Sequence, residues 1–331
     1  MLRAVQTTRL DIGRIRAARR LIDPTFRHTP LYRCEALEPA LGCAVSIKLE
    51  TANPVRSFKA RGTEVLASVL AESDQRSVVC ASAGNLGQAL AWSGRGRGLD
   101  VTVVASRHAT VAKLDRIRAL GARLELVDGD HELARERAAA LAEQHRIRLL
   151  EDSLDIETCL GAATIGLELV ETVPSYDAVL IALGGGALAT GVGHVLKALA
   201  PGVEVICVQP AGAPAMTLSW RERRVVTTET TNTIADGVAG RRPIPVVLDD
   251  LLVVADDAVL VQETSIVTGM RLLLEHAGLV VEPSAALGLA AVLEDRDRFA
   301  GRHVVTIVCG GNVDLDAYHR WVGAAGRASN A

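Results

Sequence analysis

One lysine stands out for its chemistry because it lies between an expected strand and an expected helix. The segment Ser57-Phe58-Lys59-Ala60-Arg61-Gly62 follows the apolar run 44–49 and precedes the helical run 63–71. Burial and a nearby cation both favour the neutral form of a lysine, and Arg61 is a candidate for that cation. A neutral lysine is the nucleophile that a carbonyl cofactor such as pyridoxal phosphate (PLP) requires. The alternative is a solvated surface lysine, which is the usual case.

A glycine-rich stretch follows the expected strand 178–183 and opens a helix. It reads Gly184-Gly185-Gly186-Ala187-Leu188-Ala189-Thr190-Gly191. Successive glycines allow the backbone to approach an anion, whose charge the N–H groups and the helix N-terminus then bind, so we expect a phosphate loop. Two alternatives stay open. The glycines also fit a dinucleotide fingerprint, although they lie past mid-chain, and they fit a tight turn without a ligand.

Two further strand ends carry polar groups. Ser82-Ala83-Gly84-Asn85-Leu86-Gly87-Gln88 offers a hydroxyl, backbone N–H groups and an amide at a helix N-terminus, which suits a carboxylate and a phenolate oxygen. The alternative is an ordinary helix cap. Cys309, before Gly310-Gly311-Asn312, is a candidate nucleophile, a buried apolar residue or a hydrogen-bond partner for a ring nitrogen.

The elements that position these residues alternate between strand and helix, which predicts parallel α/β sheets. The first helix is expected behind Asp11, and strands are expected at 77–81, 100–105, 123–127, 178–183, 204–208, 251–255 and 304–308. Ligands of such sheets bind outside the carboxyl ends of the strands, so the glycine-containing turns should converge on one crevice.

Composition excludes several classes of function. The 331 residues are 49% hydrophobic and 3% aromatic with a net charge of -3, which gives no reason to expect a nucleic-acid partner. No run of 18 apolar residues is free of charge, so no membrane span is expected. Six scattered cysteines without a C-x-x-C pair indicate buried thiols in a reducing, cytoplasmic setting rather than a zinc site.

Taken together, the motifs S-F-K-x-R-G, S-x-G-N-x-G-Q, G-G-G-x-L-x-x-G, A-D-G, E-P-S-A-A and C-G-G-N resemble those of the threonine/serine dehydratase and serine racemase group of fold type II PLP enzymes. The resemblance runs from about His28 to Asn312. It implies two open, mainly parallel sheets flanked by helices, with the active site in the interdomain cleft. The large domain would comprise residues 1–77 and 151–320, the small mobile domain 78–150, and a frayed tail 321–331.

The resemblance also implies roles for individual residues. Lys59 would link to PLP and shuttle the α-proton. Phe58 would flank one face of the cofactor ring, and Gly237 would lie near the other face. The cofactor-binding set would be completed by Asn85 at the 3′-oxygen, Cys309 at the pyridine nitrogen, and Gly184, Gly185, Gly186, Ala187 and Leu188 at the phosphate. The substrate carboxylate would meet Ser82, Gly84 and Asn85, and the cofactor phosphate would protonate the leaving group.

The chain departs from the group at positions that affect chemistry. Ala83 replaces the second serine of racemases, which favours elimination over racemisation. Arg56 and Leu86 stand where Gly and His are usual, so they are candidate contacts to the substrate side chain. Gln209 and Ala215 replace the carboxylates of metal-dependent members, so no divalent metal is expected, whereas a monovalent cation held by carbonyls is possible.

The sequence therefore predicts a PLP-dependent elimination on a β-hydroxy or β-substituted L-amino acid such as threonine or serine, giving a 2-oxo acid and ammonia. The resemblance also implies a homodimer. The open alternatives are PLP-dependent β- or γ-replacement, racemisation, an inactive PLP-binding protein, and a nucleotide-binding dehydrogenase built on residues 184–191.

Overall fold

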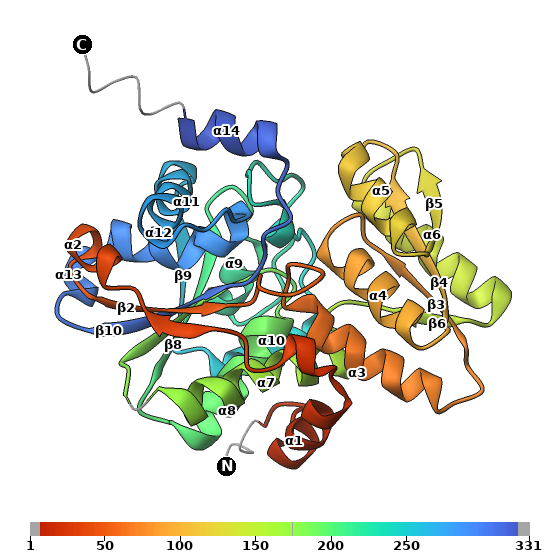
Figure 1. Ribbon diagram of the computed structural model, residues 1–331, viewed down its shortest axis with the longest axis horizontal. Coiled ribbons are helices and arrows are strands. Elements are labelled where there is room, and N and C mark those ends of the chain that lie inside the picture. The colour runs from red at the N-terminus through yellow and green to blue at the C-terminus, as the bar shows by residue number, and fades with distance from the viewer. Residues whose placement is uncertain (1–6, 174, 324–331) are drawn as a thin grey trace.

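The protein, described by a computed structural model over residues 7–173 and 175–323, contains two separate β-sheets with helices packed against them. Figure 1 shows the smaller sheet with its helices on one side of the molecule, joined to the larger body at α3. The expected class, two mainly parallel sheets flanked by helices, is confirmed.

The larger sheet has six strands in the order β1-β2-β10-β7-β8-β9. Among its pairings within the described residues, β1–β2 is antiparallel and the other four are parallel. Its strands are β1 (Leu31–Arg33), β2 (Ala44–Leu49), β7 (Ala178–Ala182), β8 (Glu204–Pro210), β9 (Asp257–Val261) and β10 (His303–Val308).

The smaller sheet has four parallel strands in the order β5-β4-β3-β6. These strands are β3 (Ser77–Ala81), β4 (Asp100–Ser106), β5 (Arg123–Val127) and β6 (Arg148–Leu150). Because all four fall in one continuous stretch, the smaller sheet is an insertion between two segments of the larger one.

The connections between strands are mostly helical, as parallel pairing requires. The helices are α1 (Ile12–Leu21), α2 (Glu38–Leu41), α3 (Lys59–Ala71), α4 (Asn85–Gly96), α5 (Val111–Ala119), α6 (His131–His145), α7 (Ile156–Thr172), α8 (Ala187–Leu199), α9 (Ala215–Glu222), α10 (Pro245–Val254), α11 (Glu263–Ala277), α12 (Leu287–Glu294), α13 (Arg296–Phe299) and α14 (Leu315–Gly323). Short 3₁₀ turns are η1 (Pro24–Phe26), η2 (Glu35–Leu37), η3 (Asp236–Val238) and η4 (Pro283–Ala286).

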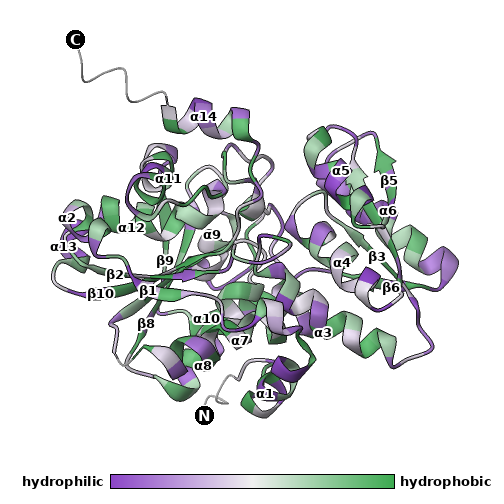
Figure 2. Cartoon of the chain, in the orientation of Figure 1, coloured by the Kyte–Doolittle hydropathy of each residue, from purple (hydrophilic) through white to green (hydrophobic). Residues whose placement is uncertain are grey.

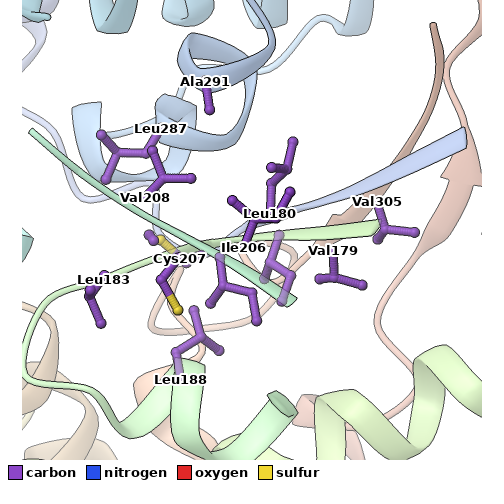
Figure 3. Packing of buried hydrophobic residues seen from close by; sticks show 14 of the residues in the cluster. Val179, Leu180, Leu183, Leu188, Ile206, Cys207, Val208, Leu287, Ala291 and Val305 are labelled. Atoms are coloured by element: carbon purple, nitrogen blue, oxygen red, sulfur yellow. The ribbon is translucent and has the colours of Figure 1, made fainter. Parts of the chain in front are cut away.

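The main core lies on both faces of the larger sheet. Figure 3 shows Leu180 and Ile206 of the strands between Leu188 of α8 on one side and Leu287 of α12 on the other. Both faces are covered, so the central strands β7 and β8 carry runs of consecutive apolar residues (178–182 and 205–208) rather than an alternation, and Figure 2 shows the sheet mainly as hydrophobic ribbon. Each fully buried leucine or isoleucine here contributes about 1.5–3 kcal/mol through removal of apolar surface from water.

Two expectations about elements need correction, and one is confirmed. Of residues 251–255, expected as a strand, 251–254 form the end of α10, which begins with Pro245 at a position where proline suits a helix. The expected frayed tail 321–331 is wrong for residues 321–323, which belong to α14; residues 324–331 lie outside the described part. Helix α1 begins behind Asp11, whose side chain accepts a hydrogen bond from Arg14 N. Among the described helices, none has the length and apolar character needed to cross a membrane.

Candidate active site

The lysine segment is held against the carboxyl end of β10. Phe58 N donates to Cys309 O at 3.1 Å, and Ser57 forms a bridge with Gly310. Ser57 Oγ accepts a hydrogen bond from Lys59 N, at the first residue of α3. Two strands that are neighbours in the sheet, β2 and β10, therefore fix where this helix starts.

The ammonium of Lys59 faces a carboxylate. Lys59 Nζ lies 2.5 Å from Asp152 Oδ2 and 4.7 Å from the centroid of the Phe58 ring. Arg61 makes its ion pairs with Glu50 and Glu168, so the expectation that Arg61 supplies a cation beside Lys59 is wrong. Residues two apart on a helix point to different sides, which separates the two cations.

Arg61 instead belongs to a fully buried charge cluster, which we call the buried quartet: Lys48, Glu50, Arg61 and Glu168. Arg61 donates to Glu50 Oε2 at 2.8 Å and to Glu168 Oε1 at 2.7 Å, and Lys48 Nζ donates to Glu168 at 2.6 Å. Burial opposes the charged form of Glu168, but Arg61 and Lys48 outweigh it and lower the pKa of Glu168 to about 2. Two cations and two anions thus leave the quartet neutral.

The glycine loop after β7 has the geometry of an anion cradle. Gly186 has φ of 113°, in the left-handed region, and a Cβ there would lie 2.4 Å from Val247 Cγ1. Helix α8 starts at Ala187, whose N–H donates to Ser153 Oγ at 3.0 Å. A Cβ on Gly185 would lie 2.7 Å from the same hydroxyl, so only glycine fits at these positions.

The turn after β3 presents the N-terminus of α4. Ser82 Oγ accepts from Gly84 N at 3.2 Å, and a Cβ on Gly87 would lie 2.1 Å from Ser82 O. The first N–H groups of a helix have no partner within the helix, so this end can bind an anion such as a substrate carboxylate.

Asn85, the first residue of α4, connects the smaller sheet to the larger. Its Nδ2 donates to both oxygens of Glu282 at 3.0 Å, and its Oδ1 accepts from Asn312 Nδ2 at 2.8 Å. Burial raises the pKa of Glu282 to about 7, although the Asn85 hydrogen bond acts in the opposite direction. The amide expected at the cofactor 3′-oxygen is thus engaged by two neighbours in this arrangement.

These segments surround one cavity of about 490 Å³ between the two sheets. The candidate residues that line it are Phe58, Lys59, Ser82, Gly84, Asn85, Leu86, Gly184, Gly185, Gly186, Ala187, Leu188, Gly237 and Cys309. Arg56 is the exception: its side chain is exposed and absent from the lining, and its backbone (φ 52°) turns the chain so that its oxygen accepts from Gly311 N.

The walls of this cavity fit PLP. Buried polar atoms that lack a hydrogen-bond partner within residues 7–173 and 175–323 include Ser284 Oγ and Asp152 Oδ1, both from lining residues. A Cβ on Gly237 would lie 2.8 Å from Ser284 Oγ, so the glycine keeps that side of the cavity open. Burial raises the pKa of the Cys309 thiol well above its ordinary value, which makes it a neutral hydrogen-bonding group rather than a nucleophile.

A second cavity of about 630 Å³ adjoins the first, and both are lined by Leu86, His131 and Asp152. Burial and the field of Arg135 lower the pKa of His131. His131, Asp152 and Ser153 were not among the expected site residues. A signal for the last two was present, because they lie two and three residues past the end of β6 and therefore at the carboxyl edge of the smaller sheet.

Within the part of the chain that the structure describes, no group of three or more His, Cys, Asp or Glu side chains is placed to hold a metal ion. The side-chain oxygen of Gln209 accepts a hydrogen bond from Thr217 N at 2.9 Å.

The fold and cavity define a PLP-dependent enzyme, and comparison with known proteins agrees. Residues 22–310 match the model of the family described as "Pyridoxal-phosphate dependent enzyme", so the chain belongs to this family. The resemblance inferred from the motifs is thereby confirmed.

Individual relatives cover nearly the whole chain. An L-threonine ammonia-lyase of Thermotoga maritima is 33% identical over 92% of this chain and 76% of its own length. A serine racemase of Oryza sativa subsp. indica is 31% identical over 92% of this chain and 91% of its own. The solved structure of threonine deaminase isoform 2 from Solanum lycopersicum superimposes with a TM-score of 0.87 at 28% identity, covering 98% of this chain and 92% of that one.

Proposed function

We propose that this protein is a lyase that eliminates the β-substituent of a β-hydroxy L-amino acid, such as threonine or serine, to give a 2-oxo acid and ammonia. The observation that carries the proposal is the single cavity that joins Lys59, the glycine cradle and the α4 N-terminus. Ammonia-lyase and deaminase relatives at about 30% identity support elimination as the reaction.

When bound, PLP supplies an aldehyde that captures the substrate amino group and a ring that withdraws electrons from Cα. The residues of this chain supply the rest. The loop 184–188 would hold the phosphate through its N–H groups, and Phe58 and Gly237, which line the same cavity, would flank the ring. The α4 N-terminus, with Ser82, Gly84 and Asn85, binds the substrate carboxylate. Lys59 Nζ takes the proton from Cα.

The neutral thiol proposed for Cys309 favours elimination. A buried thiol donates a weak hydrogen bond and carries no charge, so it would leave a ring nitrogen facing it unprotonated. Elimination does not depend on strong electron withdrawal by a protonated ring. Ala83, which lines the cavity without an acid or base, supports the same choice.

The testing experiment combines spectroscopy with turnover. We expect purified protein to show the visible absorption band of lysine-linked PLP and to release 2-oxo acid from L-threonine or L-serine. Lys59→Ala should lose both. Lys197→Ala is the matched control, because Lys197 pairs with Asp256 outside the cavity and should change neither. Bound PLP without 2-oxo acid, combined with transfer of an added thiol to the substrate, would contradict elimination and favour replacement.

Three further expectations remain proposals. Six buried, unpaired cysteines support a reducing compartment such as the cytoplasm. The family resemblance is the basis for proposing a homodimer and a small domain (78–150) that closes on substrate, which sedimentation and scattering with and without substrate would test. A monovalent cation would be detected as a dependence of activity on K⁺ or Na⁺ without a requirement for Mg²⁺.

A further inference from the structure

Asp152 occupies a position that the function above does not use. It lies in the short loop between β6 and α7, and its Oδ2 is 2.5 Å from Lys59 Nζ across 93 residues of sequence. Its other oxygen, Oδ1, is buried and has no hydrogen-bond partner in the described ranges 7–173 and 175–323. A half-satisfied carboxylate beside the reactive amine has capacity for one more proton or ligand.

The same carboxylate borders the phosphate cradle. A Cβ built on Gly185 would lie 3.7 Å from Asp152 Oδ2, and the next residue, Ser153, accepts the Ala187 N–H at the start of α8. The loop that carries Asp152 is therefore part of the wall against which the phosphate is proposed to lie. Asp152 also lines both cavities, so it faces the space open to a substrate.

The electrostatic surroundings of Asp152 change when the cofactor is loaded. Without cofactor, the Lys59 ammonium neutralises the carboxylate. Covalent attachment would leave Lys59 without the free ammonium that donates to Asp152 Oδ2, and the phosphate dianion would enter the adjacent loop. Arrival of an anion beside a carboxylate favours protonation, because two like charges at close range share a proton.

We propose that Asp152 is a general acid of this active site: it holds a proton once the cofactor phosphate occupies the 184–188 loop, and it donates that proton to the departing β-substituent. This inference rests on the proposed elimination. It assigns to a side chain a step that the motif resemblance assigns to the phosphate alone.

The proton and electron balance of the step is simple. Lys59 Nζ takes the Cα proton, the electron pair of that C–H bond forms the Cα–Cβ double bond, and the Cβ–O bond breaks with its electrons on oxygen. Asp152 donates its proton to that oxygen, so water leaves and Asp152 becomes a carboxylate. The proton held by Lys59 is then available to restore Asp152 through the contact that the structure shows.

Other ionisable groups face this carboxylate. His131 on α6, Cys80 on β3 and Cys159 on α7 all lie within its field, and Lys59 on α3 contacts it directly. Burial raises the pKa of Cys80 and of Cys159 to about 12, so both thiols stay neutral. Glu282, whose pKa burial raises to about 7, lines the same cavity, so His131→Gln and Glu282→Gln variants must both be measured beside Asp152→Asn.

The first test compares leaving groups. L-Serine expels hydroxide and needs an acid, whereas β-chloro-L-alanine expels chloride and needs none. We expect Asp152→Asn to reduce kcat/KM for L-serine by about 100-fold or more, with little change for β-chloroalanine. Glu151→Gln removes the adjacent carboxylate, which pairs with Arg135, and should keep the wild-type ratio of the two substrates. An equal loss on both substrates would overturn the proposal and make Asp152 a positioning group for Lys59.

The second test needs no turnover. Titration calorimetry of PLP into the cofactor-free protein, in buffers of different ionisation enthalpy, counts the protons that accompany binding. We expect the wild type and His131→Gln to take up about one more proton per PLP than Asp152→Asn near pH 7.5. Equal proton counts for the wild type and Asp152→Asn would refute the proposal. If the wild type eliminates neither substrate, the proposed function fails, while the proton count still decides the state of Asp152.

Discussion

Replacing Arg61 with methionine should destabilise the protein strongly, because it removes one charge from a neutral buried quartet. The guanidinium makes ion pairs with both Glu50 and Glu168, and all the side chains involved are at most 2% exposed. Removing one partner of a buried ion pair typically costs about 3–5 kcal/mol, since the remaining charge is left without compensation. At roughly 2 °C per kcal/mol for a chain of this size, Tm should fall by about 6–10 °C.

A control variant and a compensating double variant test whether the unpaired buried charge causes this loss of stability. Arg33→Met breaks a surface pair with Glu38 and should cost less than about 1 kcal/mol. Adding Glu50→Gln to Arg61→Met leaves the Lys48–Glu168 pair, which is neutral, so the double variant should regain part of the loss. Scanning calorimetry of the cofactor-loaded proteins gives all three values. A loss for Arg61→Met as small as that for Arg33→Met would refute the reasoning.

The pH dependence offers an independent check on the quartet. The pKa of Glu168 falls from an ordinary 4.5 to about 2 in the fold. A lowered carboxyl pKa contributes stability above the unfolded value, and that contribution is lost as the pH falls toward 2; here it is roughly 3 kcal/mol. We therefore expect Glu168→Gln to show a weaker loss of stability between pH 4.5 and 2 than the wild type.

Three further predictions concern other sites. Glu282 has its pKa raised from 4.5 to about 7, so folding favours its protonated form and the free energy of unfolding should fall by roughly 3 kcal/mol as pH rises from 5 to 8; Glu282→Gln should flatten this slope in urea titrations. Gly161→Ala would place a Cβ 2.3 Å from Gly62 N, so it should lower the free energy of unfolding by about 2 kcal/mol or more and lower kcat by shifting α3. The control Gly96→Ala has open space around its new Cβ, so its stability should be unchanged or higher. Gly186→Ala should weaken PLP binding at least about tenfold in fluorescence titrations, because its φ of 113° and a 2.4 Å contact exclude a methyl group.

The parts of the site that sequence could predict are those encoded locally. The 184–188 loop and the Ser82–Asn85 turn follow their strands within two residues, and Lys59 follows β2 after ten, so a strand-end rule brings them to the same region. Residues 251–255 show the limit of this approach: a short apolar run fits a buried helix as well as a strand, and its partner elements decide between them.

Long-range pairings could not be predicted from local patterns. Asp152 approaches Lys59, and Asn85 approaches Glu282, only because the smaller sheet packs beside the larger one. The error about Arg61 had a different origin: the helix was expected over residues 63–71, whereas α3 begins at Lys59, and helical geometry separates residues two apart. Its true partners, Glu50 and Glu168, lie 11 and 107 residues away.

The position of β10 in the larger sheet has a consequence for synthesis of the chain on the ribosome. This strand is the central partner of β2 and β7, yet it is made after every other strand. The smaller sheet can be completed once Leu150 has emerged, whereas β2 and β7 must wait, with open apolar edges, for the last part of the chain. Unpaired strand edges are where nascent chains associate wrongly. The nascent protein therefore passes through a stage with one finished sheet and one that is divided in two.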